Sequence, residues 1–173
     1  MGLRDRVAER RGGDKPLRFK MKERMFSIGD DYWIEDDDDN KVFKVDGKLL
    51  RIRDTFDIKD NEGNVVVSIQ EKMISIRDAM TIEYEGQEAK IKKALIGIRE
   101  RYVIDMGDGK KFKAQGNFVD HEYEIECDDG HKIGEVSKAW FRLRDTYGVE
   151  VMDQQYTSLI LAITVCIDAM AHD

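Results

Sequence analysis

The sequence has few of the residues that interrupt β-sheets, form disulfides or bind metals. Its 173 residues include one proline, two cysteines and three histidines. The proline, Pro16, lies near the start, so nothing after it blocks the hydrogen-bond ladder of a sheet. The cysteines, Cys127 and Cys166, show neither disulfide nor metal spacing, and we see no signal peptide. We therefore expect two reduced thiols in a cytoplasmic protein.

The sequence also lacks a surplus of positive charge. Lysine and arginine number 29 against 36 acidic residues, which gives a net charge of -7. This balance supplies no uniform basic field, so nucleic acid is not an expected partner. Residues 1–16 differ, because four arginines surround Leu3 and Val7 and a Gly-Gly pair follows. We expect a flexible basic tail over 1–16 and a single domain over 17–173.

A unit of about 23 residues, centred on variants of Ile-Arg-Asp, occurs six times. The arginine position of each copy serves as its anchor, and the spacings between anchors are 24, 24, 22, 21 and 24. The residues before, three after and five after each anchor are apolar in every copy. The anchors are Gly29, Arg53, Arg77, Arg99, Asp120 and Arg144. A repeat therefore organises the fold.

Within each copy the apolar residues alternate with a period of two, which indicates strands with one buried face. Turn-forming Gly, Asn and Asp clusters separate the runs. We predict five hairpins, an opening strand over 19–28 and a closing strand over 146–152, which makes 12 strands in all. The hairpins are predicted over 32–45, 55–70, 80–93, 101–115 and 121–138.

The last segment, 154–171, breaks this pattern. It has no turn signal, Asp153 stands at the position of an N-cap, and the residues from Leu159 to Ile167 are apolar on all sides. Such a helix must be enclosed by protein or lipid. The run is shorter than the roughly 20 residues of a membrane span, and Asp168 interrupts it. A barrel of 12 strands has a lumen that side chains alone cannot fill. We predict a closed antiparallel barrel around a central helix.

Five short motifs precede the apolar C-terminus: Gly29–Ile34, Lys48–Asp54, Lys72–Asp78, Asp120–Ile125 and Trp140–Val149. In their order and spacing these segments resemble the LURP-one-related family, over about residues 17–171. That resemblance implies a tubby-C-terminal-like fold, in which a 12-stranded barrel surrounds a hydrophobic C-terminal helix, shared with tubby proteins and phospholipid scramblases. It implies no catalytic motif. The basic residues with which tubby proteins bind phosphoinositides, and the calcium-linked segment of scramblases, have no match here.

Three groups of polar residues are candidate sites. The acidic run Asp36–Asn40 suggests calcium, but an EF-hand loop would need Gly at Lys41 and Glu at Gly47, so we favour a solvated hairpin turn. The histidines show no zinc spacing, and we expect His121 and His131 to be exposed. These histidines flank one hairpin and could approach each other across it. The third histidine is His172.

The third group is the set of recurring arginines, Arg53, Arg77, Arg99 and Arg144. They either pair across strands with acidic residues, which we favour, or converge at one end of the barrel as an anion site. The run Gly107–Lys111 is too short for a phosphate-binding loop.

Because a helix fills the lumen in which a buried active site would lie, we expect a non-enzymatic module. We assign it no catalytic, cofactor-binding or metal-binding residue, and expect a monomer that binds a partner protein or an anionic phospholipid head group on its outer surface. The first alternative is a scramblase-like, membrane-associated protein with its terminal helix in the bilayer. The second is an enzyme, which would need a cleft with several strongly shifted titratable groups.

Overall fold

The alternation of apolar and polar residues produces twelve strands in the part of the chain that the structure describes. The computed structural model describes residues 15–22, 31–47, 55–71, 79–96, 99–141 and 145–171. The strands are β1 (Leu17–Lys22), β2 (Tyr32–Asp36), β3 (Lys41–Gly47), β4 (Thr55–Asp60), β5 (Val65–Glu71), β6 (Ala79–Tyr84), β7 (Gln87–Ile96), β8 (Arg99–Asp105), β9 (Lys111–Asn117), β10 (Glu122–Glu126), β11 (Lys132–Ser137) and β12 (Thr146–Val151). A 3₁₀ helix, η1 (Gln154–Tyr156), leads into the helix α2 (Thr157–Ala171).

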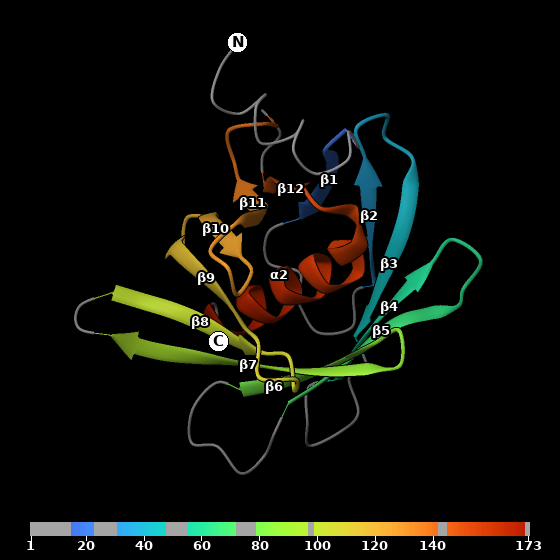
Figure 1. Cartoon of the computed structure of the whole chain (residues 1–173). Coiled ribbons are helices and arrows are strands. Elements are labelled where there is room, and N and C mark those ends of the chain that lie inside the picture. Colours follow the sequence, from blue (N-terminus) through green and yellow to red (C-terminus); the bar gives the residue numbers. More distant parts are fainter. Residues whose placement is uncertain are drawn as a thin grey trace.

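Each strand pairs antiparallel with its neighbours in sequence, and β1 closes the barrel by pairing with both β12 and β2. Figure 1 shows this sequential order as a continuous change of colour around the wall. The prediction of a closed 12-stranded antiparallel barrel built from hairpins is confirmed. Closure matters because it leaves no free sheet edge on which another chain could add a strand.

The repeat supplies the inner face of the wall. The position five residues after the anchor is at most 1% exposed in all six copies. The position before the anchor behaves differently in the one copy whose side chain is described, because Val119 is 60% exposed and the neighbouring Phe118 is buried instead. Apolar character at this position of the repeat therefore does not place Val119 in the core. The six residues of the inner position are Ile34, Ile58, Ile82, Ile104, Ile125 and Val149.

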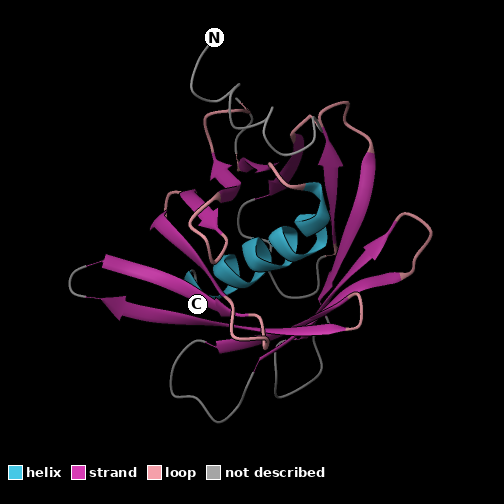
Figure 2. Cartoon of the chain, viewed as in Figure 1, coloured by secondary structure: helices cyan, strands magenta, loops and turns pink. Residues whose placement is uncertain are grey.

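Helix α2 lies in the space that the strands enclose (Figure 2). All nine residues from Leu159 to Ile167 are fully buried, as a helix with no polar face requires. Asp153 is the N-cap, and its side chain accepts a hydrogen bond from the backbone N–H of Gln155 at 3.3 Å. The wall comes close to the helix at Gly134, where an added Cβ would lie 3.1 Å from Ile160. The predicted helix over 154–171 is confirmed, with η1 as its first turn.

The Asp of the repeated motif has a conformational explanation. The residue after the anchor has a left-handed backbone at Asp145 (φ 59°) and at its counterpart His121 (φ 53°). Asp and His are among the residues that tolerate this conformation best. In these two copies the motif marks the point where the chain turns into the next strand, whereas Glu100, the counterpart that follows Arg99, lies within β8. The equivalent Asp54 and Asp78 lie outside the described residues, as does the predicted tail except for Lys15 and Pro16.

A substitution at Gly116 tests the pairing of β9 with β10. The backbone of Gly116 has φ 144°, and an added Cβ would lie 2.5 Å from the carbonyl oxygen of Glu122. We expect Gly116→Ala to lower the free energy of unfolding by about 2–4 kcal/mol, since the strand must move or strain. Gly47→Ala is the control, because its Cβ would meet only Phe56 at 3.6 Å. Urea unfolding of both variants measures the difference. Equal small losses would contradict the described pairing of β9 with β10.

Candidate functional site

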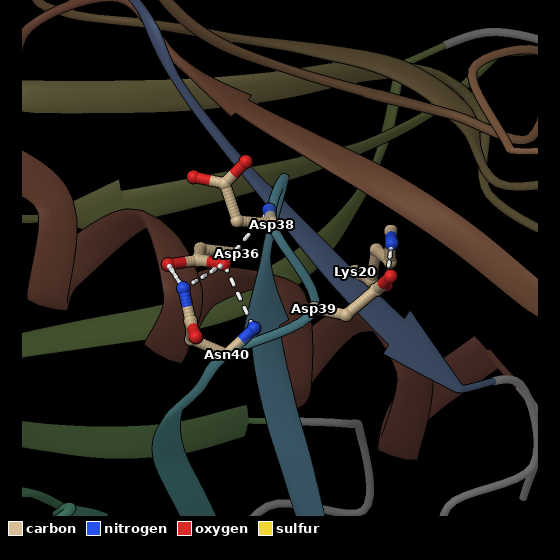
Figure 3. A network of polar contacts seen from close by, with 5 residues as sticks. All are labelled: Lys20, Asp36, Asp38, Asp39 and Asn40. Carbon is tan, nitrogen blue, oxygen red and sulfur yellow. Dashed lines mark hydrogen bonds and ion pairs between the residues drawn. The ribbon is translucent and has the colours of Figure 1, made fainter.

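The acidic run Asp36–Asn40 forms the hairpin turn between β2 and β3 (Figure 3). One carboxylate oxygen of Asp36 accepts from the backbone N–H groups of Asp38 and Asn40, both at 2.9 Å. The side-chain amide of Asn40 donates to both oxygens of Asp36, and these bonds lower the pKa of Asp36. Asp39 turns instead toward Lys20 on β1. The hairpin turn is confirmed, and its central carboxylate is occupied by the turn itself.

The structure separates the two histidines that the sequence placed together. His131 is exposed, as predicted, in the turn between β10 and β11. His121 is not exposed, and that prediction is wrong, because its side chain is only 2% exposed and its Nε2 lies 2.7 Å from Oδ1 of Asp168 on α2. The prediction failed because Asp168, the partner that makes burial of the imidazole favourable, lies 47 residues away in the sequence. His172 lies outside the described residues.

Asp168 is the centre of a buried polar cluster between α2 and the wall. Its Oδ1 contacts His121, and its Oδ2 accepts a hydrogen bond from the hydroxyl of Tyr147 on β12. The rings of His121 and Tyr147 stack with their centroids 4.2 Å apart. A buried carboxylate is tolerated only where hydrogen bonds and charge replace its lost hydration. The contacts therefore fasten the C-terminal half of the helix to the wall.

Tyrosines from three strands surround this carboxylate. Burial raises the pKa of Tyr32, Tyr123 and Tyr147 well above the usual value, and the negative charge of Asp168 adds to the effect. All three tyrosines occupy the position three residues after an anchor. Equivalent positions of the repeat therefore place them in the interior of the barrel. The cluster is closed to solvent, since its side chains are at most 8% exposed. The arrangement suits a structural anchor better than a site that must admit a substrate.

The run Gly107–Lys111, expected from its length not to bind phosphate, uses its backbone donors within its own turn. The turn within Gly107–Lys111 directs the backbone N–H of Gly107 to Asp105 and that of Lys110 to Asp108, both at 3.0 Å. These donors are therefore not available to a phosphate. Arg53, Arg77 and Arg144 lie outside the described residues, and the side chain of Arg99 is not described. The ring of arginines stays a prediction.

The turn between β10 and β11 brings together three groups that the sequence spacing did not suggest. The thiol of Cys127, the carboxylate of Asp129 and the imidazole of His131 each place one possible ligand atom within 4.8 Å of the others. Burial raises the pKa of Cys127, and the hydrogen bond from this thiol lowers the pKa of Asp129. Three possible donors therefore converge in this turn, although the histidines show no zinc spacing. The signal that could have found them is a Cys, an Asp and a His at alternate positions of a tight turn.

A surface hollow of about 440 Å³ lies along β5, β6 and β7. Its ten lining residues form the stretches 65–68 and 83–88. The only charged side chains among them are Glu83, Glu85 and Glu88, all exposed. Val65 adds an apolar surface that is 51% exposed. No local pattern predicts this groove, because it forms only when strands from different repeats lie side by side.

A family model described as LURP-one-related matches residues 17–168. The chain belongs to the LURP-one-related family. A protein of Arabidopsis thaliana, known from an X-ray structure, is similar to this LURP-one-related chain with a TM-score of 0.64 and 15% identity. The similarity covers 88% of this chain and 91% of that one, and at this identity it shows the fold alone. No curated protein matches by sequence. Among the described residues, no helix has the length and apolarity needed to span a membrane.

Because of its buried tyrosines, we expect this LURP-one-related protein to lose stability in alkaline solution. The three phenols have a higher pKa folded than unfolded, so near pH 10 the unfolded chain loses protons that the folded chain keeps. Stability is then complete below pH 10 and falls as the pH rises above it, by about 1 kcal/mol per pH unit and per tyrosine. Urea unfolding at pH 9, 10 and 11 measures this slope. A Tyr32→Phe variant should reduce this slope by about 1 kcal/mol per pH unit, whereas an unchanged slope would contradict the buried placement of Tyr32.

Proposed function

We propose that this LURP-one-related protein is a non-enzymatic binding module that binds a basic segment of a partner protein in the groove along β5, β6 and β7. The observation that carries the proposal is the charge of this groove, which is lined by Glu83, Glu85 and Glu88 and by no cationic side chain. A segment containing lysine or arginine complements that charge, and carboxylates spaced along neighbouring strands suit an extended chain.

The filled interior supports a ligand on the outside. A small-molecule site needs a concave, enclosed space, and here the lumen holds the fully buried residues Leu159–Ile167. The buried carboxylate of Asp168 is occupied by His121 and Tyr147. Chemistry on a bound substrate would require opening the barrel. The outer surface needs no such change.

The groove itself combines charge with an apolar contact. Val65 is half exposed at its edge, and the hydroxyl of Tyr84 donates to the side chain of Gln87 at 3.3 Å. The cation Lys90 lies beside Glu88 with 3.5 Å between Nζ and Oε1, and both side chains are more than half exposed. Exposed pairs of this kind are weak, so a ligand cation can displace the lysine.

An anionic phospholipid head group is the less favoured ligand. Cations on the outer wall face carboxylates at short range: Arg18 lies 2.7 Å from Glu150, Lys59 2.7 Å from Asp46 and Lys132 2.6 Å from Glu135. Such pairs reduce the positive field that a lipid surface would need. We propose likewise that the protein is a cytoplasmic monomer without a cofactor, which its two free thiols support.

The test measures binding of a fluorescent peptide that alternates lysine with valine, and of an otherwise identical peptide with glutamate in place of lysine, by anisotropy at two salt concentrations. We expect binding of the lysine peptide only, weaker at high salt because exposed charges are screened. Glu83→Gln/Glu85→Gln/Glu88→Gln should weaken this binding about tenfold or more, as three lost charge pairs predict.

The matched control is Asp37→Asn/Asp120→Asn/Asp145→Asn, which changes the net charge equally at exposed positions outside the groove. It should leave the affinity within about twofold, because distant charges are screened. Equal weakening by both triple variants would contradict the proposal that the groove is the binding site. Binding to phosphatidylserine vesicles, with none to the lysine peptide, would overturn the protein partner in favour of a lipid head group.

A further inference from the structure

The turn that holds Cys127, Asp129 and His131 is one of four turns with the same backbone among the described residues. In each, the N–H of the first residue donates to the carbonyl of the fifth at 2.9–3.0 Å. The fourth residue always has a positive φ, at Asp39, Gly63, Gly109 and Gly130. The turns span residues 36–40, 60–64, 106–110 and 127–131. Four copies of one turn show what its geometry needs and what it does not.

In two of these turns the first and fifth side chains bond to each other. Asn40 donates through Nδ2 to Oδ2 of Asp36, and Asn64 does the same to Asp60, both at 3.1 Å. In the third turn the corresponding residues are Met106 and Lys110, and the backbone still closes at 3.0 Å. The turn therefore directs the side chains of its first and fifth residues to the same side of the backbone. It does not require particular residue types at these two positions. Cysteine and histidine at these positions are not needed to make the turn.

The fourth turn uses this geometry to bring three different donor atoms together. The thiol of Cys127 donates to Oδ1 of Asp129 at 2.6 Å, and Nδ1 of His131 lies 2.7 Å from Oδ2 of the same carboxylate. The backbone N–H of His131 also donates to Oδ1 at 3.0 Å, which orients Asp129. Cys127 is buried, whereas the side chains of Asp129 and His131 are 49% and 54% exposed. The thiol thus lies beneath two groups that are open to solvent.

We propose that Cys127, Asp129 and His131 bind one divalent transition-metal ion of the zinc class. A thiolate, an imidazole nitrogen and a carboxylate oxygen are the three kinds of ligand that zinc takes in proteins, and the thiolate disfavours magnesium and calcium. Three protein ligands leave a fourth position for water or for a group from a partner. The other cysteine cannot compete, because Cys166 is fully buried in α2.

Binding of the metal ion releases one proton from the site. The thiol gives up its proton to solvent, the imidazole binds through Nδ1 in its neutral form, and Asp129 is already ionised. Ligand atoms around a tetrahedral zinc ion lie roughly 3.4–3.6 Å apart, so the atoms now at 2.6–2.7 Å must separate by about 1 Å. Rotation of the exposed Asp129 and His131 side chains supplies such a movement.

The test uses the full chain, freed of metal under reducing conditions and titrated with Co²⁺. We expect a thiolate-to-cobalt absorption band that saturates at one ion per chain and is abolished by Zn²⁺. Cys127→Asp/His131→Asn restores the pair found in the first two turns, so it should keep the circular dichroism and unfolding midpoint of the metal-free chain. It should lose the band and bind Zn²⁺ at least about a hundredfold more weakly in competition with a chromophoric chelator.

Cys166→Ala is the control for the other thiol and should keep both the band and the affinity, because its side chain is enclosed. A band that survives the double substitution, or that disappears with Cys166→Ala, would overturn the site. The absence of any band at an equivalent of Co²⁺, with Zn²⁺ held more weakly than by the free imidazole of a histidine peptide, would overturn it as well.

Discussion

The enclosure of one helix by the wall is the constraint on which the structure depends. A helix with apolar residues on every side is stable only where water is excluded, and the residues from Leu159 to Ile167 meet that condition completely. The wall in turn needs the helix, since a barrel of this strand number leaves a space that its own side chains cannot fill. Wall and helix each supply the surface that the other must bury, and ligand binding is left to the outer surface.

Asp168 gives this packing a defined position. Apolar contacts alone would tolerate a helix shifted or rotated within the lumen, but a buried carboxylate must meet His121 and Tyr147 or remain uncompensated. We infer that the cluster serves specificity more than net stability. The cost of removing the Asp168 carboxylate from water offsets much of the favourable free energy of its hydrogen bonds. The repeat contributes here in an unexpected way, since the same position that supplies Met80 to the core in one copy supplies Tyr147 in another.

The strands, the hairpins and the helix could be predicted because their signals are local. Alternation in Tyr123 and Ile125, the turn residues around Gly130 and the uninterrupted run at Leu159–Ile167 all act over a few positions. The prediction for His121 was wrong because its burial depends on a distant partner, Asp168 on α2. Val119 shows that apolar character alone does not place a residue of the repeat in the core, since the adjacent Phe118 is buried instead.

The candidate sites follow the same division. The acidic turn at Asp36–Asn40 was predicted from its composition, whereas the three donors from Cys127 to His131 converge only through side-chain orientation within a turn. The groove requires Val65 and Glu88 to be brought together by neighbouring strands. Both proposed sites thus lie where the copies of the repeat differ, on turns and outer positions that the common core leaves unconstrained.

Amide hydrogen exchange in α2 tests the enclosure most directly. If the helix leaves the lumen only when the barrel unfolds, the amides from Leu159 to Ile167 should exchange with a single free energy, within about 1 kcal/mol of that for global unfolding in denaturant. Exchange of these amides at a free energy several kcal/mol lower, with the strands still protected, would show that the helix leaves an intact barrel and would contradict the account.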